Sequence, residues 1–173
     1  MYEFTPIPEP IEPVEPKAEW VRADEATGYD FPRPLVLVNG TFDVLHVGHL
    51  QIVNTAIRQA ATVLVSIDSD EMVKSKKGPD RPILTWVERA SQIAQLGVDF
   101  IHEALDDNDF RRLVSVWKPD FRVRGADYID RESRIRNVPS VYVEHVSDMS
   151  STDIIQRILG RQALRIKGEV TVQ

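Results

Sequence analysis

Two closely spaced histidines are the residues of this chain best suited to do chemistry. His46 and His49 lie three positions apart with Gly48 between them, and they are half of the four histidines in the sequence. They follow an apolar run at 35–38 and precede apolar residues at helical spacing, so they fall at a helix opening. The free N–H groups and dipole of a helix opening favour phosphate, and a glycine lets the backbone approach a ligand closely.

Two other interpretations of this pair stay open on spacing alone. A zinc site would need more ligands, but the chain has no cysteine and only two distant histidines, His102 and His145. The pair could also be ordinary surface residues. His102 and His145 lie in no motif, and we expect both to be structural.

Alternating strand and helix patterns predict the scaffold that must position the histidines. Short apolar runs predict five strands, at 35–38, 63–67, 99–102, 121–124 and 140–144. Helical spacing predicts helices at 48–61, 85–96, 110–117 and 152–159; Thr85 and Glu88 form a capping box, Gly160 could stop the last helix, and Trp86 and Trp117 suit helix packing better than base stacking. The expected fold class is α/β: a single Rossmann-like doubly wound domain with a mostly parallel five-stranded sheet, whose ligands bind beyond the carboxyl ends of the strands.

Composition limits the function classes. The 173 residues are 42% hydrophobic, which suits one domain, and no apolar run approaches the roughly 20 residues of a membrane helix. The acidic, proline-rich start does not resemble a secretory signal, so we expect a cytoplasmic protein. The net charge of -6 comes mostly from the first 34 residues, and the near-neutral remainder argues against nonspecific nucleic-acid binding.

The domain organisation follows from the same shift in composition. Residues 1–34 hold seven of the eleven prolines and are expected to form a flexible arm; the alternative is an arm whose Trp20 and Phe31 dock on the domain or on a partner subunit. Residues 35–160 form the predicted domain, and 161–173 a C-terminal extension of ambiguous structure.

Four ordered segments resemble one family. The run GTFDVLHVGH at 40–49 is similar to the HxGH signature of the nucleotidyltransferase superfamily, in its cytidylyltransferase-like branch. KSKKGPDRP at 74–82 followed by Glu88 and Arg89, KPDFRVRGADY at 118–128, and MSST at 149–152 resemble later segments of that branch in the same order. The likeness covers residues 35–160 and is nearest to the adenylyltransferase domains of ADP-heptose synthases, then to glycerol-3-phosphate cytidylyltransferases.

The resemblance implies roles for individual residues. His46, His49, Lys74 and Lys77 would be catalytic, with the lysines on a mobile cover, although on their own they suit a solvated loop. Nucleotide contacts would come from Gly40, Thr41, Phe42, Gly48, Lys76, Arg81, Arg124, Gly125, Asp127, Ser150, Ser151 and Thr152. Asp43, Asp70 and Arg89 would bind the second substrate, although Asp43 could instead hold the turn and Arg89 could be a surface residue.

The implied reaction transfers a nucleoside monophosphate from ATP or CTP to a sugar phosphate and releases pyrophosphate. A polyol-phosphate cytidylyltransferase is the alternative, and His145 and Asp148 stand where that group has arginine and glycine. An inactive nucleotide-binding module is the alternative of another class. We expect Mg²⁺ without a dedicated protein cage, and a homodimer, as is common in the family.

Overall fold

The computed structural model describes residues 17–25, 31–129, 135, 137–144 and 150–166. Six strands form one parallel sheet in the order β1-β4-β3-β2-β5-β6. The strands are β1 (Glu19–Val21), β2 (Leu35–Gly40), β3 (Thr62–Asp68), β4 (Phe100–Ala104), β5 (Phe121–Gly125) and β6 (Ser140–Val143). The helices are α1 (Val47–Gln59), α2 (Asp70–Lys77), α3 (Trp86–Ala94), α4 (Asp107–Trp117) and α5 (Ser151–Ile166), with a short 3₁₀ turn at Ala126–Tyr128.

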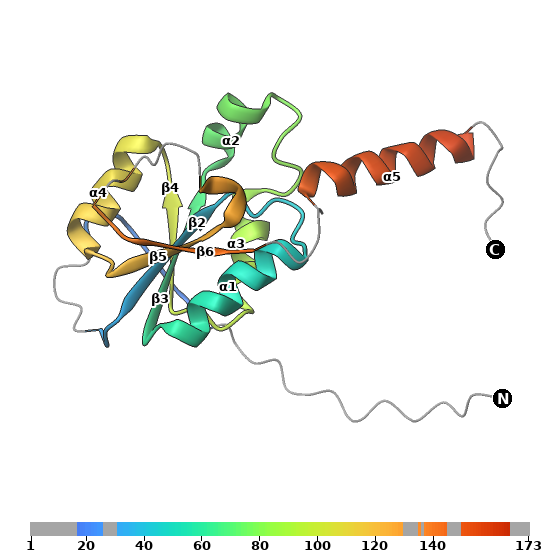
Figure 1. The fold of residues 1–173 in the computed structure, drawn as a ribbon. Coiled ribbons are helices and arrows are strands. Elements are labelled where there is room, and N and C mark those ends of the chain that lie inside the picture. The colour runs from blue at the N-terminus through green and yellow to red at the C-terminus, as the bar shows by residue number, and fades with distance from the viewer. Residues whose placement is uncertain (1–16, 26–30, 130–134, 136, 145–149, 167–173) are drawn as a thin grey trace, which may run out of the picture.

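Helices cover both faces of the sheet, as Figure 1 shows, and an apolar layer lies on each face. Alternation along β2 places Val36 and Val38 on one face, where they pack with α1 and α3. Leu35 and Leu37 lie on the opposite face and pack with α4, including Trp117. The prediction of a Rossmann-like α/β domain is therefore confirmed. Within the described ranges, none of the helices combines the length and apolar character needed to cross a membrane.

The sheet has one strand more than predicted, because part of the proline-rich segment joins it. Glu19–Val21 pairs parallel with β4, where Glu19 lies opposite Phe100. Trp20 packs edge-on against Trp86 with ring centroids 5.0 Å apart. Phe31 stacks on Trp117 with centroids 5.5 Å apart. These two aromatic residues of the segment therefore dock on the domain.

Two helices differ from their predictions. α2 is an additional helix where a loop was expected, and Ser69 caps it by accepting a hydrogen bond from Met72 N–H. The predicted stop at Gly160 is wrong, because α5 continues through it to Ile166. A single glycine costs a helix only about 1 kcal/mol, which the surrounding turns offset. The capping box of Thr85 and Glu88 opens α3 as predicted.

Candidate active site

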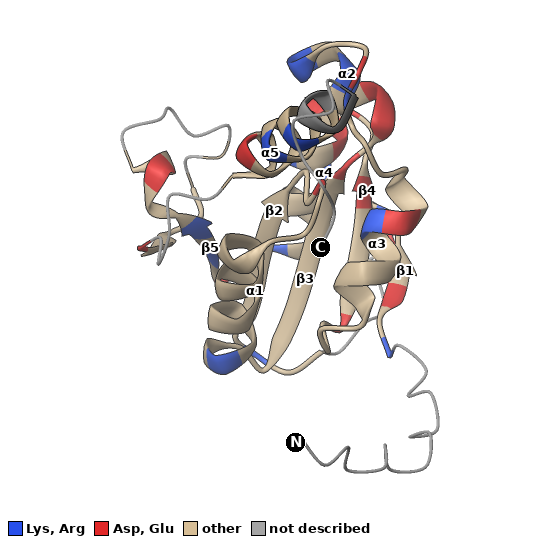
Figure 2. Cartoon of the chain, turned by 90° about the vertical axis from the view of Figure 1, so that its right-hand side faces the viewer, with Lys and Arg blue, Asp and Glu red and all other residues tan. Residues whose placement is uncertain are grey.

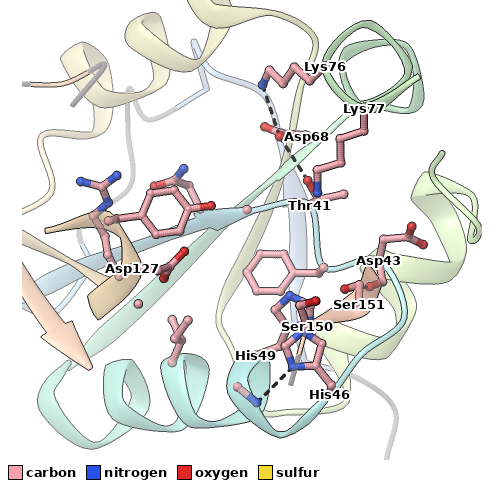
Figure 3. Close-up of a pocket in the computed structure, with 18 of the residues that line it drawn as sticks. Thr41, Asp43, His46, His49, Asp68, Lys76, Lys77, Asp127, Ser150 and Ser151 are labelled. Carbon is pink, nitrogen blue, oxygen red and sulfur yellow. Dashed lines mark hydrogen bonds and ion pairs between the residues drawn. The ribbon is translucent and has the colours of Figure 1, made fainter. Parts of the chain in front are cut away.

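A pocket of about 760 Å³ opens at the carboxyl ends of the strands. β2 has β3 on one side and β5 on the other, so the order of the strands reverses at β2. Parallel sheets leave a crevice at such a reversal, since the connections on either side run to opposite faces. Figure 3 shows side chains from the β2–α1 turn, α2, β5 and the start of α5 converging on this space.

The turn between β2 and α1 forms the floor of the pocket and is tightly folded. Phe42 and Val44 have φ angles of 54° and 53°, in the left-handed region that side chains rarely adopt. Asp43 between them is 1% exposed, although it contributes to the pocket lining. Its carboxylate accepts hydrogen bonds from Arg81 Nε at 2.7 Å and from the N–H groups of Ile83 and Leu84 at about 3.0 Å. Asp43 therefore ties the turn to the segment before α3.

The charge of Asp43 is stabilised by these donors. Burial by itself raises the pKa of this carboxyl group, but the N–H groups of Leu84 and Ile83 and the Arg81 guanidinium lower it by more. The pKa of Asp43 is therefore held below its ordinary value. Its backbone carbonyl accepts a hydrogen bond from the Ser151 hydroxyl, so the same residue also fixes the start of α5.

The two histidines lie together at the opening of α1. Their rings stack with centroids 3.8 Å apart, and the His49 ring also meets Phe42 at 5.2 Å. His46 caps the helix: its Nδ1 accepts a hydrogen bond from Gly48 N–H at 3.2 Å. A neutral imidazole that accepts at Nδ1 carries its proton on Nε2, so Nε2 is the donor nitrogen of the His46 ring.

α2 brings a cationic side to the pocket. Lys76 Nζ lies 3.3 Å from Asp68 Oδ2, and Lys77 and Arg81 line the pocket beside it. Partial desolvation and the neighbouring Arg81 charge lower the pKa of Lys77. Lys74 lies outside the pocket lining, where it is exposed and 3.8 Å from Glu71 Oε1. Figure 2 shows both signs of charge on this helix.

Arg89 and Asp70 form a support behind the pocket and do not line it. The Arg89 side chain is fully buried, and its Nη2 lies 2.7 Å from Asp70 Oδ1. Arg89 also donates to the backbone carbonyls of Leu84 and Thr41. The guanidinium therefore holds the end of β2 against α2 and α3, and in this geometry it acts on the pocket through Thr41.

The end of β5 forms the opposite wall. The Arg124 guanidinium lies 4.7 Å from the Tyr128 ring centroid, within cation–π range. Arg122 lies two residues earlier on the same face, is 3% exposed, and donates to Ser140 Oγ at 2.8 Å. Burial and the neighbouring Arg124 charge lower the pKa of Arg122.

The opening of α5 completes the pocket. Ser150 and Asp153 cap the helix reciprocally: the Ser150 N–H and hydroxyl donate to Asp153 Oδ2, and Asp153 N–H donates to Ser150 Oγ. Asp153 therefore has a pKa below its ordinary value, chiefly because of the Ser150 hydroxyl. Ser150, Ser151 and Thr152 line the pocket at this helix end. His145 and Asp148 lie outside the described residues.

The pocket brings together most of the predicted site residues. Those lining it are Gly40, Thr41, Phe42, Asp43, His46, Gly48, His49, Lys76, Lys77, Arg81, Arg124, Gly125, Asp127, Ser150, Ser151 and Thr152. Lys74, Asp70 and Arg89 are the predicted residues absent from the lining. The structure adds Asn39, Ile52, Asp68, Phe110, Arg122, Val123 and Tyr128. Asn39 and Asp68 could have been found, because polar residues at carboxyl ends of neighbouring parallel strands meet at one edge of a sheet.

A model of the cytidylyltransferase-like family matches residues 37–157. The bifunctional protein HldE of Campylobacter fetus subsp. fetus is 35% identical over 133 residues, which cover 74% of this chain and 28% of that protein. A D-beta-D-heptose 1-phosphate adenylyltransferase of Bordetella bronchiseptica is 40% identical over 99 residues, which cover 56% of this chain and 60% of that protein. The chain thus spans well under half of the length of the HldE relative.

Solved structures share the fold at lower identity. The lipopolysaccharide core biosynthesis protein from Thermoplasma volcanium has a TM-score of 0.54 and 21% identity, and the match covers 65% of this chain and 98% of that one. A pantothenate synthetase from Thermus thermophilus has a TM-score of 0.57 and 19% identity, with 78% and 66% covered. At such identities the likeness is one of fold alone.

Proposed function

Because the chain belongs to the cytidylyltransferase-like family, we propose that it transfers adenylate from ATP to a sugar phosphate and releases pyrophosphate. The single observation that carries the proposal is the convergence of His46, His49, Lys77, Arg81 and Ser151 on one pocket. The relatives named HldE and D-beta-D-heptose 1-phosphate adenylyltransferase support ATP and a heptose 1-phosphate as the substrates to test first.

The reaction is an in-line displacement at the α-phosphorus of the triphosphate. A phosphate oxygen of the acceptor forms the new bond, the bond from the α-phosphorus to the bridging oxygen breaks, and pyrophosphate leaves with that electron pair. Negative charge grows on the oxygens around the α-phosphorus and on the leaving group. Fixed donors at those oxygens are what the protein must supply, because they stabilise the transition state more than the bound substrates.

The α1 opening supplies such donors at one end of the pocket. His46 is turned by its hydrogen bond from Gly48 N–H so that Nε2 can donate to a phosphate oxygen. His49 stacks against it and contacts the tilted Phe42 ring, and these contacts restrict the motion of both imidazole rings. In this proposal the α-phosphate lies at these rings, and Lys77 and Arg81 meet the remaining phosphates from the side of α2.

The α5 opening receives the leaving pyrophosphate in this proposal. Ser150, Ser151 and Thr152 line the pocket at the first turn of α5, and a helix N-terminus favours anions. The Ser151 hydroxyl is bonded to the carbonyl of Asp43, so the helix end is fixed relative to the histidines.

Mg²⁺ is the expected companion of the triphosphate, where it would neutralise phosphate charge. Within the described residues no group of three or more potential ligands forms a metal cage. Mg²⁺ needs only one or two carboxylates beside phosphate oxygens and water, and the pocket offers Asp68 and Asp127. The Lys76 ammonium beside Asp68 would repel a second cation there, so we assign the hydrated ion to the Asp127 side of the pocket.

The experiment measures pyrophosphate release by the purified chain with ATP and with CTP across a panel of acceptors. We expect turnover with ATP and a sugar 1-phosphate. Turnover confined to CTP and glycerol 3-phosphate would assign the chain to the polyol-phosphate alternative, and nucleotide binding without any turnover would make it a binding module. The homodimer and the cytoplasmic location stay predictions, and light scattering of the full chain tests the first.

A further inference from the structure

One corner of the pocket has more hydrogen-bond acceptors than donors. The corner consists of Asn39, Thr41 and Asp68, at the carboxyl ends of the neighbouring strands β2 and β3. Asn39 lies opposite Ser66 in the sheet, and Asp68 follows Ser66 by two residues, so both side chains project from the same face. Neither Asn39 nor Asp68 belongs to the motifs that carry the family resemblance or to the reaction steps given above.

Asp68 is the focus of this corner. Its side chain is 13% exposed, and Oδ2 receives Lys76 Nζ at 3.3 Å and the Thr41 hydroxyl at 3.5 Å. Both contacts are long and share one oxygen, so the carboxylate retains capacity to accept further hydrogen bonds. The Asn39 carboxamide oxygen is shielded from solvent and has no hydrogen-bond donor among the described residues. The corner therefore has acceptor capacity, chiefly at Asp68, that the described residues do not use and that donors of a ligand can use.

The opposite end of the pocket has the reverse chemistry. Figure 3 places His46, His49, Ser150 and Ser151 together at one end, with Asp68 beside Lys76 and Thr41 at the other. A triphosphate would be attracted to the donor end and repelled by a carboxylate, because like charges oppose each other in a partly desolvated site. The hydroxyl groups of a neutral ring are the donors that suit Asp68, while its partner Lys76 suits an attached phosphate.

We infer that Asp68 is a specificity-determining residue that binds hydroxyl groups of a polyhydroxylated acceptor, with Asn39 as its neighbour and Lys76 on the acceptor phosphate. This inference rests on the proposed function and identifies the part of the pocket that binds the hydroxyl groups of the sugar. It explains why an acidic side chain lies inside a pocket for two phosphorylated substrates. A carboxylate that accepts from sugar hydroxyls rejects an analogue lacking them, since its desolvated oxygen is then left without a donor.

The experiment compares wild type with Asp68→Asn, using heptose 1-phosphate and its singly deoxygenated analogues with ATP. We expect Asp68→Asn to raise the acceptor KM about tenfold to a hundredfold, the range of a lost charge-assisted hydrogen bond. The KM for ATP should stay within about twofold. With wild type, the KM for the deoxy analogue that lacks the bound hydroxyl should be higher by about the same factor. The variant should have similar KM values for this analogue and for the parent sugar phosphate. Asp80→Asn, an exposed acid outside the pocket, is the matched control.

Each other outcome overturns the inference in a separate way. If Asp68→Asn and Lys76→Met both raise the KM for ATP and spare the acceptor, Asp68 only orients Lys76 for the triphosphate. If Asp68→Asn chiefly raises the Mg²⁺ concentration needed for half-maximal rate, Asp68 holds the ion. A wild type that binds ATP by calorimetry but neither binds nor turns over any sugar phosphate would overturn the proposed function together with this inference. Thermal melting and ATP binding of Asp68→Asn verify that the variant is folded.

Discussion

The two helix openings that meet at the pocket are held in different ways. α1 opens directly after the central strand β2, and Val53 and Ala56 bury it against the sheet. α5 extends from the domain in Figure 1, and Ile158 and Leu159 on it are 58% and 57% exposed. The Ser151 hydroxyl connects the α5 opening to the turn at Asp43.

Both helix openings offer groups for binding phosphate, but different interactions hold them in place. At α1 the buried helix face supplies most of the support and His46 adds only the cap, so replacing a histidine should change reactivity more than stability. At α5 the residues that line the pocket lie next to the residues that hold the helix in place. Replacing one of them should therefore weaken nucleotide binding by moving the helix end. Asp43 contacts both helix openings, so replacing it should affect both of them.

The largest effect is expected at α1. We predict that His46→Ala and His49→Ala each lower kcat about 10²–10³-fold, because each change removes a donor to the transition state. Pyrophosphate release at saturating substrates measures the effect, and Val47→Ala, the exposed residue between them, is the control. If either variant retained activity within a few fold while remaining folded, the role proposed for the α1 opening would be wrong.

The next effect is expected at Asp43, which connects the two openings. Asp43→Ala leaves Arg81 and two N–H groups without their buried acceptor, so the free energy of unfolding should fall by about 3–5 kcal/mol. Asp43→Asn keeps an acceptor oxygen and should cost about 1–3 kcal/mol. Urea titration measures both changes. Equal losses for the two variants would mean that a neutral acceptor oxygen cannot replace the carboxylate, so that the whole contribution of Asp43 depends on its charge.

The pH dependence of stability should follow the same residue. The pKa of Asp43 is lowered in the folded state, so its contribution is complete above the pKa of a free aspartate, about 3.9, and disappears as pH falls through the lower folded value. Wild type should therefore lose stability relative to Asp43→Asn below about pH 4. Denaturant titrations of both proteins at several pH values test this, and parallel curves would contradict it.

The smallest effect is expected at α5. Ser151→Ala removes the bond to the Asp43 carbonyl, and we predict that the KM for ATP rises about tenfold with kcat nearly unchanged. Asp153→Ala removes only the cap partner of Ser150 and should raise that KM a few fold. A fall in kcat as large as that of the histidine variants would mean that α5 acts in the chemical step.

The sequence predicted the elements that carry strong local signals. The capping box at Thr85 opens α3, and the apolar run at the start of β2 forms the buried centre of the sheet. α2 was missed because its lysines outweighed the Ser69 cap and the acidic first turn of Asp70 and Glu71. The β1 pairing was missed because three residues in a proline-rich segment carry little periodicity.

The site residues that lie within the four motif segments could be predicted from the sequence. The roles of Arg89 and Asp43 were harder to predict, since polar residues that face a ligand and those that support it look alike in sequence. Arg89 is fully buried behind the pocket, which only the packing of α2, α3 and the β2 end reveals. Asp68 reaches the pocket through tertiary placement of β3 beside β2.

The short strand β1 covers one edge of the longer strand β4. β4 pairs with β3 on one side and with β1 on the other, and its residues Phe100 and Ile101 are almost fully buried. A chain truncated before residue 31 would leave the outer backbone groups of β4 open to another sheet edge. Such a truncated chain should aggregate during expression although it would retain every residue that lines the pocket.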